Sequence, residues 1–344
     1  MINKISDRIL HKKPLLLLLA LIIFAAGFMV GQFSNNRLLP LRKAPRATTE
    51  MRLGGYDFIN PLLECESAKD SFESGELRPF RHKLESLIEE QKKKGWASHV
   101  SVYFREMNNG LSFDIDGKEH FSPASLIKVP LLIAYFKWAE TDHSLMRKKL
   151  TFTSRENFDA NQNIKPAFSI EYGKSYFIED LIFRSIAYSD NNAFYLLFVN
   201  VNQTILRQTY TDLGLEVPTA RTIEDSISVS DYASFFRILF NASYLNHEMS
   251  EKALEYLSDV DYKEGLVGGV PPETVVSHKF GERALTSPAG TVFELHDCGI
   301  VYYRDHPYLL CVMTKGKSFE YLDDAIREVS HLVYEEIEHH YPGQ

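Results

Sequence analysis

The stretch Phe121-Ser-Pro-Ala-Ser-Leu-Ile-Lys-Val-Pro-Leu-Leu-Ile-Ala-Tyr-Phe136 predicts a turn followed by a helix that is apolar nearly all round. Such a helix is typical of an element buried on every side. Ser125 and Lys128 stand three residues apart, so their side chains share one face of the helix. A buried lysine loses hydration, which lowers the pKa of its amine. The stretch therefore predicts a neutral Lys128 amine that accepts the proton of a nucleophilic Ser125 hydroxyl.

The Ser-x-x-Lys spacing alone is a weak signal, because it occurs by chance about once in a chain of this length. A helix cap followed by a solvated lysine is the alternative. Two features favour the nucleophile: this is the only Ser-x-x-Lys in the sequence, and its helix has almost no polar face for Lys128 to occupy. The unpaired N–H groups of a first helical turn also favour negative charge developing on Ser125.

The composition limits the classes of function. The chain has 344 residues, 44% of them hydrophobic, and a formal net charge of −8. This length accommodates one large or two smaller globular units, and the negative charge argues against nucleic acid as a partner. No group of cysteine, histidine and carboxylate residues has metal-ligand spacing, and the sequence contains no glycine-rich phosphate loop, so neither a metal nor another cofactor is predicted.

The N-terminal region contains a candidate membrane anchor. Residues 14–33 carry no charge, are rich in Leu, Ile, Ala and Phe, and are long enough to span a bilayer. Basic residues precede them, which favours residues 1–13 in the cytoplasm and the bulk of a single-pass membrane protein outside it. These residues are Lys4, Arg8, Lys12 and Lys13. A cleaved signal peptide is the alternative, although the apolar run is longer than is usual for one.

Residues 34–75 predict a linker whose second half, with the apolar run Asn60-Pro-Leu-Leu-Glu-Cys65, docks on the main domain. The main domain is expected over 76–344, with strands at both ends and helices between them. A helical stripe begins at Glu76 and stops at Gly95, and a hairpin follows over 98–115. Residues 120–268 predict mostly helix, including 175–186, 191–201 and 229–239. Further strands are expected over 274–281, 292–294, 298–303 and 308–313, and a last helix over 319–339. This order indicates an α/β sheet layer interrupted by an all-α unit.

The three cysteines, Cys65, Cys298 and Cys311, are too few for a disulfide framework. Cys298 and Cys311 lie in two strand-like runs, and hairpin counting allows them to share a face. Buried free thiols are nevertheless the expectation.

Two further polar clusters carry candidate chemistry. Ser189-Asp-Asn191 lies between two apolar segments, where three adjacent hydrogen-bonding residues are costly to bury. A helix N-cap is the alternative. His278-Lys-Phe-Gly281 lies in a strand pattern, where a lysine with a glycine two residues on indicates close backbone approach to a ligand. An exposed strand lysine beside a bulge glycine is the alternative.

Taken in order, Ser125-x-x-Lys128, Ser189-Asp-Asn191 and Lys279-Phe-Gly281 resemble the three motifs of the penicillin-recognising serine hydrolases, Ser-x-x-Lys, Ser-Asp-Asn and Lys-Thr-Gly. The surrounding sequence is similar to the class A β-lactamase family from about Glu76 to the C-terminus. The resemblance implies a β-lactamase/transpeptidase-like α+β fold, an antiparallel sheet flanked by helices with an inserted all-α subdomain over about 120–268.

The resemblance also implies catalytic roles. Ser125 would be the acylated nucleophile and Lys128 its proton acceptor. Ser189 would relay a proton to the leaving nitrogen, whereas Asp190 is interpreted as structural.

Substrate-binding roles follow in the same way. Asn191 would bind the amide of the substrate's side chain, and Lys279 would attract a substrate carboxylate and keep the Ser189 network poised. The oxyanion hole would combine the backbone N–H groups of Ser125 and of Glu282, the residue after Gly281. Such donors contribute about 3 kcal/mol each in the transition state.

Two departures from the family pattern limit the implied activity. Phe280 replaces the threonine of Lys-Thr-Gly, which removes a hydroxyl that helps to bind the substrate carboxylate. The family's Glu-x-x-Leu-Asn loop, whose glutamate activates the deacylating water, has no match. Glu224 and Asp225 are the nearest candidates, with Glu216 behind them, and a solvated loop carboxylate is the alternative. Without such a base, acylation could proceed while release stalls.

The sequence thus predicts a monomeric serine acyl-hydrolase of class A β-lactamase type that opens β-lactams or D-Ala-D-Ala-like amides of peptidoglycan stems. The first alternative is a slow-turnover penicillin-binding protein or D-alanyl-D-alanine peptidase. The second is a non-catalytic domain that binds the cell wall or senses β-lactams.

Overall fold

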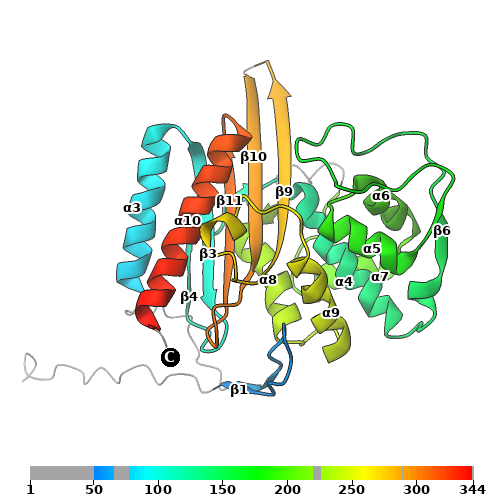
Figure 1. Cartoon of the computed structure of the whole chain (residues 1–344), viewed down its shortest axis with the longest axis horizontal. Helices are drawn as coiled ribbons and strands as arrows, with labels where there is room; N and C mark the ends of the chain where they lie inside the picture. The colour runs from blue at the N-terminus through cyan, green and yellow to red at the C-terminus, as the bar shows by residue number, and fades with distance from the viewer. Residues whose placement is uncertain (1–49, 66–76, 220–225, 289, 343–344) are drawn as a thin grey trace, which may run out of the picture. The chain divides into compact units, whose positions relative to one another are not determined.

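Five antiparallel strands form the central sheet of the chain (Figure 1). The structure is a computed structural model that describes residues 50–65, 77–219, 226–288 and 290–342. The strand order is β4-β3-β11-β10-β9. The bounds are Ala97–Glu106 for β3, Ser112–Ile115 for β4, Val276–Ser287 for β9, Gly290–Val301 for β10 and Tyr308–Gly316 for β11. Because β3 pairs with β11, the two ends of the domain build the sheet together.

One strand is longer than the sequence predicts. The apolar runs over 292–294 and 298–303 suggest two strands, whereas β10 is continuous and pairs with both β9 and β11 along its length. His296 and Asp297 interrupt the apolar pattern but are fully buried. Each has a hydrogen-bond partner, the Ser122 carbonyl for His296 and the His278 ring for Asp297, so neither leaves an uncompensated polar group in the sheet.

The two faces of the sheet carry separate hydrophobic cores. Alternation in β3 sends Val100, Val102 and Phe104 to one face and Tyr103 to the other. The first face is covered by α3 (Arg78–Lys94) and α10 (Phe319–His340), which lie side by side in Figure 1. The opposite face packs against helices from the middle of the chain.

Both covering helices match their predicted stripes and have recognisable ends. Gly95 has φ 75° and donates its N–H to the last carbonyls of α3, as a left-handed C-terminal glycine does. The Ser318 hydroxyl accepts the N–H of Tyr321 and so caps α10.

The middle of the chain is mostly helical, as predicted, but it also contains strands. Its helices are α4 (Lys128–Ala139), α5 (Ile178–Ala187), α6 (Asn191–Asn200), α7 (Gln203–Thr211), α8 (Val229–Phe240) and α9 (His247–Ser258). The helix expected over 175–186 begins at Ile178, because Ser175–Phe177 (β7) pairs instead with Lys149–Thr151 (β6). A second ribbon joins β5 (His120–Phe121) to β8 (Ile227–Ser228).

The segment before the domain forms a hairpin of β1 (Glu50–Arg52) and β2 (Leu62–Cys65). The Arg52 guanidinium donates to the Met107 carbonyl at 2.5 Å. The Glu251 carboxylate on α9 accepts the backbone N–H of Ile59 at 2.9 Å. These contacts connect the segment to both the sheet and the helical layer.

The predicted anchor over 14–33, the cytoplasmic segment 1–13 and the first part of the linker lie outside the described residues, so they stay predictions. Among the helices that the structure does describe, none has the length and hydropathy to cross a membrane.

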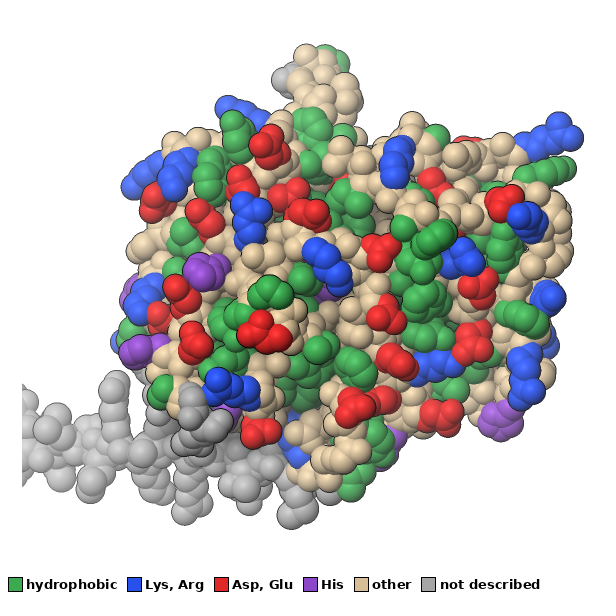
Figure 2. All heavy atoms as spheres, in the orientation of Figure 1, with side chains coloured by type: hydrophobic (Ala, Val, Ile, Leu, Met, Phe, Trp, Pro, Cys, Tyr) green, Lys and Arg blue, Asp and Glu red, His purple; other side chains and the backbone are tan. Residues whose placement is uncertain are grey.

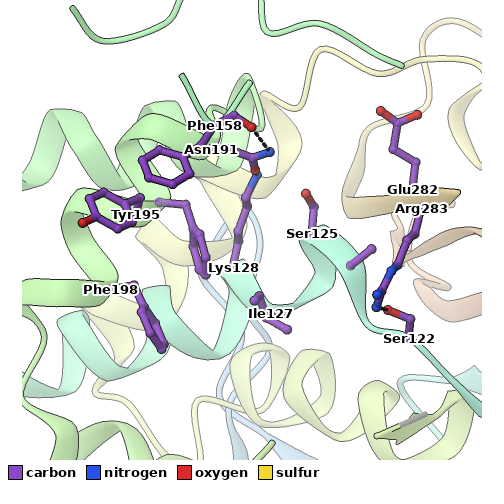
Figure 3. A pocket seen from close by; sticks show the side chains of 12 residues that line it. Ser122, Ser125, Ile127, Lys128, Phe158, Asn191, Tyr195, Phe198, Glu282 and Arg283 are labelled. Atoms are coloured by element: carbon purple, nitrogen blue, oxygen red, sulfur yellow. Dashed lines mark hydrogen bonds between the residues drawn. The ribbon is translucent and has the colours of Figure 1, made fainter. Parts of the chain in front are cut away.

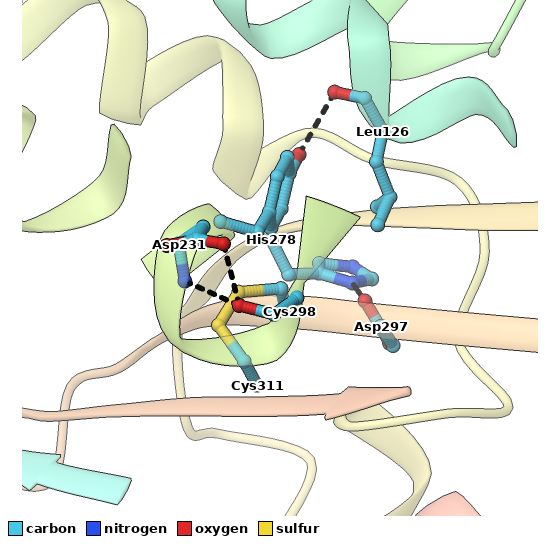
Figure 4. Close-up of a disulfide and its surroundings, with 8 residues drawn as sticks. Leu126, Asp231, His278, Asp297, Cys298 and Cys311 are labelled. Carbon is cyan, nitrogen blue, oxygen red and sulfur yellow. Dashed lines mark hydrogen bonds and ion pairs between the residues drawn. A yellow bond between two sulfur atoms is a disulfide. The ribbon is translucent and has the colours of Figure 1, made fainter. Parts of the chain in front are cut away.

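Cys298 and Cys311 form a disulfide between β10 and β11 (Figure 4). The two residues are directly opposite in the antiparallel register, with Cα atoms 3.9 Å apart. The expectation of free thiols is therefore wrong, although the shared face is correct. Strand register decides whether two thiols meet, and the apolar pattern of the two runs leaves that register open.

The surface that Figure 2 shows carries acidic and basic side chains interspersed with hydrophobic ones. On this face the acidic side chains are not gathered in one patch.

Candidate active site

Ser125 lies in a tight turn before α4 rather than in the helix itself. A 3-10 turn spans Ala124–Ile127, and α4 begins at Lys128. Ala124 has φ 45°, a left-handed conformation that costs a non-glycine residue about 1–3 kcal/mol. The Tyr232 hydroxyl of α8 donates to the Leu126 carbonyl at 3.0 Å, so a buried side chain holds the strained turn in place.

Side chains from the sheet hold the turn from the other side. His296 Nε2 donates to the Ser122 carbonyl at 2.9 Å, and its Nδ1 accepts the backbone N–H of Thr314 at 3.2 Å. Burial lowers the pKa of His296 to about 4, so the ring is neutral and this pair of bonds fits one tautomer. Arg283 donates to the Ser122 hydroxyl at 2.9 Å.

Lys128 is buried, with 2% of its surface exposed, and its amine has three acceptors. Nζ donates to the Ser189 carbonyl at 2.8 Å, to Ser189 Oγ at 2.9 Å and to Asn191 Oδ1 at 2.6 Å. Burial lowers the pKa of the amine to about 7 against the opposing effect of nearby carboxylates, which confirms the predicted direction. Among the hydrogen bonds of the described residues, none joins this amine to the Ser125 hydroxyl.

Ser189 connects the two buried lysines of the site. Its hydroxyl accepts from Lys128 at 2.9 Å and from Lys279 at 3.1 Å. Lys279 is fully buried, and burial followed by the charge of Lys128 holds the pKa of its amine well below the ordinary value. Ser189 has φ 54°, a second strained position at the site. The three motif segments therefore meet, as the sequence predicts.

Asp190 and Asn191 have different tasks. Asp190 accepts the N–H of Ala193 at 2.9 Å, which caps α6, and the N–H of Ile170 at 2.9 Å. Burial raises the pKa of its carboxyl to about 6. Asn191 points its Oδ1 at Lys128 and donates from Nδ2 to the Phe158 carbonyl at 3.2 Å. The helix-cap alternative is therefore correct for Asp190. Its neighbours Ser189 and Asn191 accept hydrogen bonds from the Lys128 amine.

A polar segment that was not predicted to belong to the site bonds to Ser189, Asn191 and Asn192. The buried Asp159 carboxylate accepts the backbone N–H of Asn191 at 2.7 Å and the Nδ2 of Asn192 at 2.8 Å. Gln162 donates to the Ser189 carbonyl at 2.9 Å. The signal was the run Asn157-Phe-Asp-Ala-Asn-Gln-Asn163, whose dense amide and carboxylate groups need partners when buried.

Gly281 lets β9 approach the nucleophile turn. A Cβ at this position would stand 2.9 Å from the Pro123 carbonyl oxygen and 3.2 Å from the Leu126 nitrogen. The sequence predicts close approach to a ligand, whereas the observed close approach is to the backbone of the turn that carries Ser125. β9 is an edge strand of the sheet and contacts the 3-10 turn, so the backbone of Glu282 comes near Ser125. Phe280 turns away, buried with its ring 4.4 Å from that of Tyr262.

These segments surround a pocket of about 400 Å³ that is lined in part by Ser125 (Figure 3). Figure 3 shows Ser125 between two walls, with Lys128 and aromatic rings on one side and Glu282 and Arg283 on the other. Glu282 Oε1 accepts the N–H of Ile164 at 2.8 Å, and its buried Oε2 has no hydrogen-bond partner within the described part of the chain. The pocket is lined by Ser122, Ala124, Ser125, Ile127, Lys128, Phe158, Asn191, Phe194, Tyr195, Phe198, Glu282 and Arg283.

Of the three candidates for the deacylating base, the structure describes only Glu216. Glu224 and Asp225 lie outside the described residues. Glu216 is exposed and is not among the described residues that line the pocket. Within the described ranges, no group of three His, Cys, Asp or Glu residues could hold a metal ion.

A nucleophile turn packed against an edge strand, with a serine bridging two buried lysines, defines a class of serine hydrolases, that of the β-lactamases and penicillin-binding proteins. A family model described as the beta-lactamase enzyme family matches residues 79–337. The chain therefore belongs to the beta-lactamase enzyme family. No protein with a curated description matches it.

Solved structures share the fold at low sequence identity. A PBP-A variant solved as an acyl-enzyme complex with penicillin G is 19% identical, with a TM-score of 0.62 over 75% of this chain and 97% of its own. A β-lactamase from Chitinophaga pinensis is 18% identical, with a TM-score of 0.62 over 74% of this chain and 99% of its own. TLA-3 extended-spectrum beta-lactamase is 18% identical, with a TM-score of 0.65 over 74% and 98%.

Proposed function

We propose that the protein opens β-lactams or D-Ala-D-Ala-like amides through an acyl-enzyme on Ser125. The observation that carries this proposal is the Ser189 hydroxyl, which accepts hydrogen bonds from both Lys128 and Lys279. Two buried amines with lowered pKa values on one hydroxyl form a route along which a proton can move near neutral pH.

In the acylation step, the Ser125 oxygen bonds to the substrate's carbonyl carbon and the amide C–N bond breaks. The Ser125 proton passes to the neutral Lys128 amine, Ser189 gives its proton to the leaving nitrogen, and Lys128 restores the proton of Ser189. Rotation of the Ser125 side chain or one water would connect it to Lys128, since both line one pocket and catalytic hydrogen bonds often tighten only with substrate.

The negative charge on the carbonyl oxygen would be held by the backbone N–H groups of Ser125 and Glu282. The close approach of Gly281 to the turn supports this placement. Such donors act without reorganising during the reaction, which is why they stabilise the transition state strongly.

A slow-turnover penicillin-binding protein is the second candidate. Among the described lining residues Glu282 is the one carboxylate, and one of its oxygens already accepts the N–H of Ile164. Among the described lining residues, those beside Lys128 include the aromatic side chains of Phe158, Phe194 and Phe198. In this alternative, the acyl-enzyme on Ser125 forms faster than it clears.

The test is to incubate the domain with a fluorescent penicillin and a chromogenic cephalosporin, next to a Ser125→Ala variant. Peptide mapping locates the label. Label on Ser125 that clears as product accumulates supports a β-lactamase, and label that persists supports the slow-turnover protein. Absence of Ser125-dependent label contradicts both and favours a binding domain.

We also propose that residues 14–33 anchor the chain with its domain outside the cytoplasm. This proposal rests on the uncharged apolar run and the basic residues before it. Protease treatment of intact cells tests it: the domain should be digested from outside while the first 13 residues stay protected.

A further inference from the structure

The Lys279 amine is closed off from the pocket around Ser125. Lys279 exposes none of its surface, and its Nζ donates to Ser189 Oγ at 3.1 Å and to the Phe280 carbonyl at 3.2 Å. The centre of the Phe280 ring lies 4.0 Å from the same atom. The described residues that line the pocket include neither Lys279 nor Phe280. A ligand in this pocket therefore has no contact surface on the Lys279 amine.

A second buried ring fixes Phe280 in this position. Phe280 and Tyr262 each expose 3% of their surface, and their ring centres lie 4.4 Å apart. The Tyr262 hydroxyl donates to the Asp323 carboxylate on α10. Moving the two rings aside would open a cavity and break this hydrogen bond, and both changes cost free energy. We call Phe280 and Tyr262 the aromatic plug.

The charged groups among the described lining residues do not suit an anion. The Lys128 amine already donates to three acceptors. The Arg283 guanidinium donates to the Ser122 hydroxyl, and Figure 3 shows this side chain running toward Ser122 and away from the nucleophile's hydroxyl. Glu282 adds a carboxylate to the lining. A second carboxylate in this pocket would be repelled by Glu282, and its burial without a cationic partner is costly.

We infer that the aromatic plug makes the protein prefer amides and lactams whose leaving group carries no carboxylate. This inference rests on the proposed acyl-enzyme at Ser125 and specifies its substrate class as one with an uncharged group, such as an ester or a primary amide, in place of that carboxylate. The reaction itself is unchanged: the Ser125 oxygen bonds to the carbonyl carbon, the C–N bond breaks, and Ser189 protonates the leaving nitrogen.

Proton transfer and carboxylate binding make different demands on Lys279. A proton moves along hydrogen bonds, so Lys279 can act on Ser189 while it stays buried. A carboxylate instead needs a space of its own size beside the amine, and the Phe280 ring occupies that space. Phe280→Thr removes the ring and supplies a hydroxyl, so it should open this space to an anionic leaving group.

The experiment compares benzylpenicillin with its methyl ester, which differ only in the carboxylate. The second-order rate of Ser125 acylation in the full chain is measured by mass spectrometry and divided by the rate of alkaline hydrolysis of the same compound. The wild-type chain should react about tenfold faster with the ester. Phe280→Thr should abolish this ratio. Phe293→Thr, on β10 and outside the lining of this pocket, should keep it.

The outcomes separate the inference from the function on which it rests. If Ser125 is labelled and the wild-type chain reacts at least as fast with the acid as with the ester, the inference alone is overturned. It is also overturned if Phe280→Thr keeps the wild-type ratio while thermal unfolding shows that it is folded. Phe280→Leu, which keeps an apolar side chain at this buried position, is measured beside it and should lower the ratio in part. If neither compound labels Ser125, the proposed function fails and the inference fails with it.

Discussion

The two hydrophobic cores of the central sheet differ in whether they adjoin the pocket around Ser125. On the face covered by α3 and α10, the core is built from aliphatic and aromatic residues such as Leu84 and Val329. The helical layer on the other face also encloses Lys128, Ser189 and Lys279 at nearly full burial. Burial disfavours the charged form of an amine. The lowered pKa values of the layer's two lysines are the chemical consequence.

The largest expected effect is on the acylation rate, through a substitution in the layer that encloses Lys128, Ser189 and Lys279. Lys128→Met should lower the rate of Ser125 acylation about a thousandfold, because positioned acid-base groups contribute on that scale. Lys137→Met is the matched control, since this α4 lysine bonds to Glu140 and the Tyr244 carbonyl outside the pocket. Acylation kinetics with a fluorescent penicillin measure both, and equal losses in the two variants would contradict the role.

The wild-type acylation rate should also depend on pH. The reactive form of Lys128 is the neutral amine, whose fraction rises as pH increases through its pKa of about 7. The rate is therefore expected to rise with pH and to reach half its plateau near pH 7, and the Lys128→Met variant should lack this limb. A wild-type profile that is flat between pH 6 and 8 would rule out Lys128 as the titrating base.

On the apolar face, substitution should change stability without changing chemistry. Leu84→Ala should lower the free energy of unfolding by about 3 kcal/mol, as the removal of a fully buried leucine leaves a cavity. Leu87→Ala, on the same helix but half-buried, should cost less. Urea unfolding gives both values. A fall in the acylation rate of folded Leu84→Ala protein would show that the two faces are coupled.

His296 connects the nucleophile turn to acid stability. Its folded pKa of about 4 is below the ordinary value, so the unfolded chain binds the proton more readily. Its contribution is complete above pH 6.5 and is lost as pH falls toward 4. Between pH 6.5 and 5 the loss should be about 2 kcal/mol. His296→Gln, which cannot titrate, should show a flatter dependence in urea unfolding at matched pH values, and equal slopes would contradict the assignment.

The smallest expected effect concerns Glu282. Its carboxylate lines the pocket and should repel a penicillin carboxylate, so Glu282→Gln should raise the acylation rate with anionic β-lactams about fivefold. The amide oxygen can still accept the N–H of Ile164, whereas Glu282→Ala removes both the charge and that contact. An increase in Glu282→Ala alone would show that the contact, not the charge, limits the reaction.

Much of the fold was predictable because each element obeys a local rule. The periodicity of α3 and α10 and the alternation of β3 placed those elements to within a few residues. The helix expected from Ser175 was wrong at its start, because pairing with residues distant in the chain overrode local preference. The disulfide was missed for the same reason, since it depends on strand register.

The candidate site residues could be predicted where they belong to a recognisable motif. Ser125, Lys128, Ser189, Asn191 and Lys279 were singled out by the resemblance of three motifs to those of a known family, and the structure brings the three motif segments together. The motifs did not reveal how they meet: the Lys128 amine contacts Ser189 and not Ser125 in this structure. Asp159 was missed because the carboxylate acts on Asn191 from 32 residues away in the sequence.

The sequence alone determined the order of the main helices and strands, the buried character of the Lys128 helix and the candidates for the reactive groups, because these follow from local composition and spacing. Only the tertiary structure decided which hydroxyl joins the two lysines, which wall of the pocket is aromatic and where β9 approaches the nucleophile turn. The physical reason is that burial and hydrogen bonding depend on contacts between distant segments, and those contacts set both the pKa of an amine and the direction of a side chain.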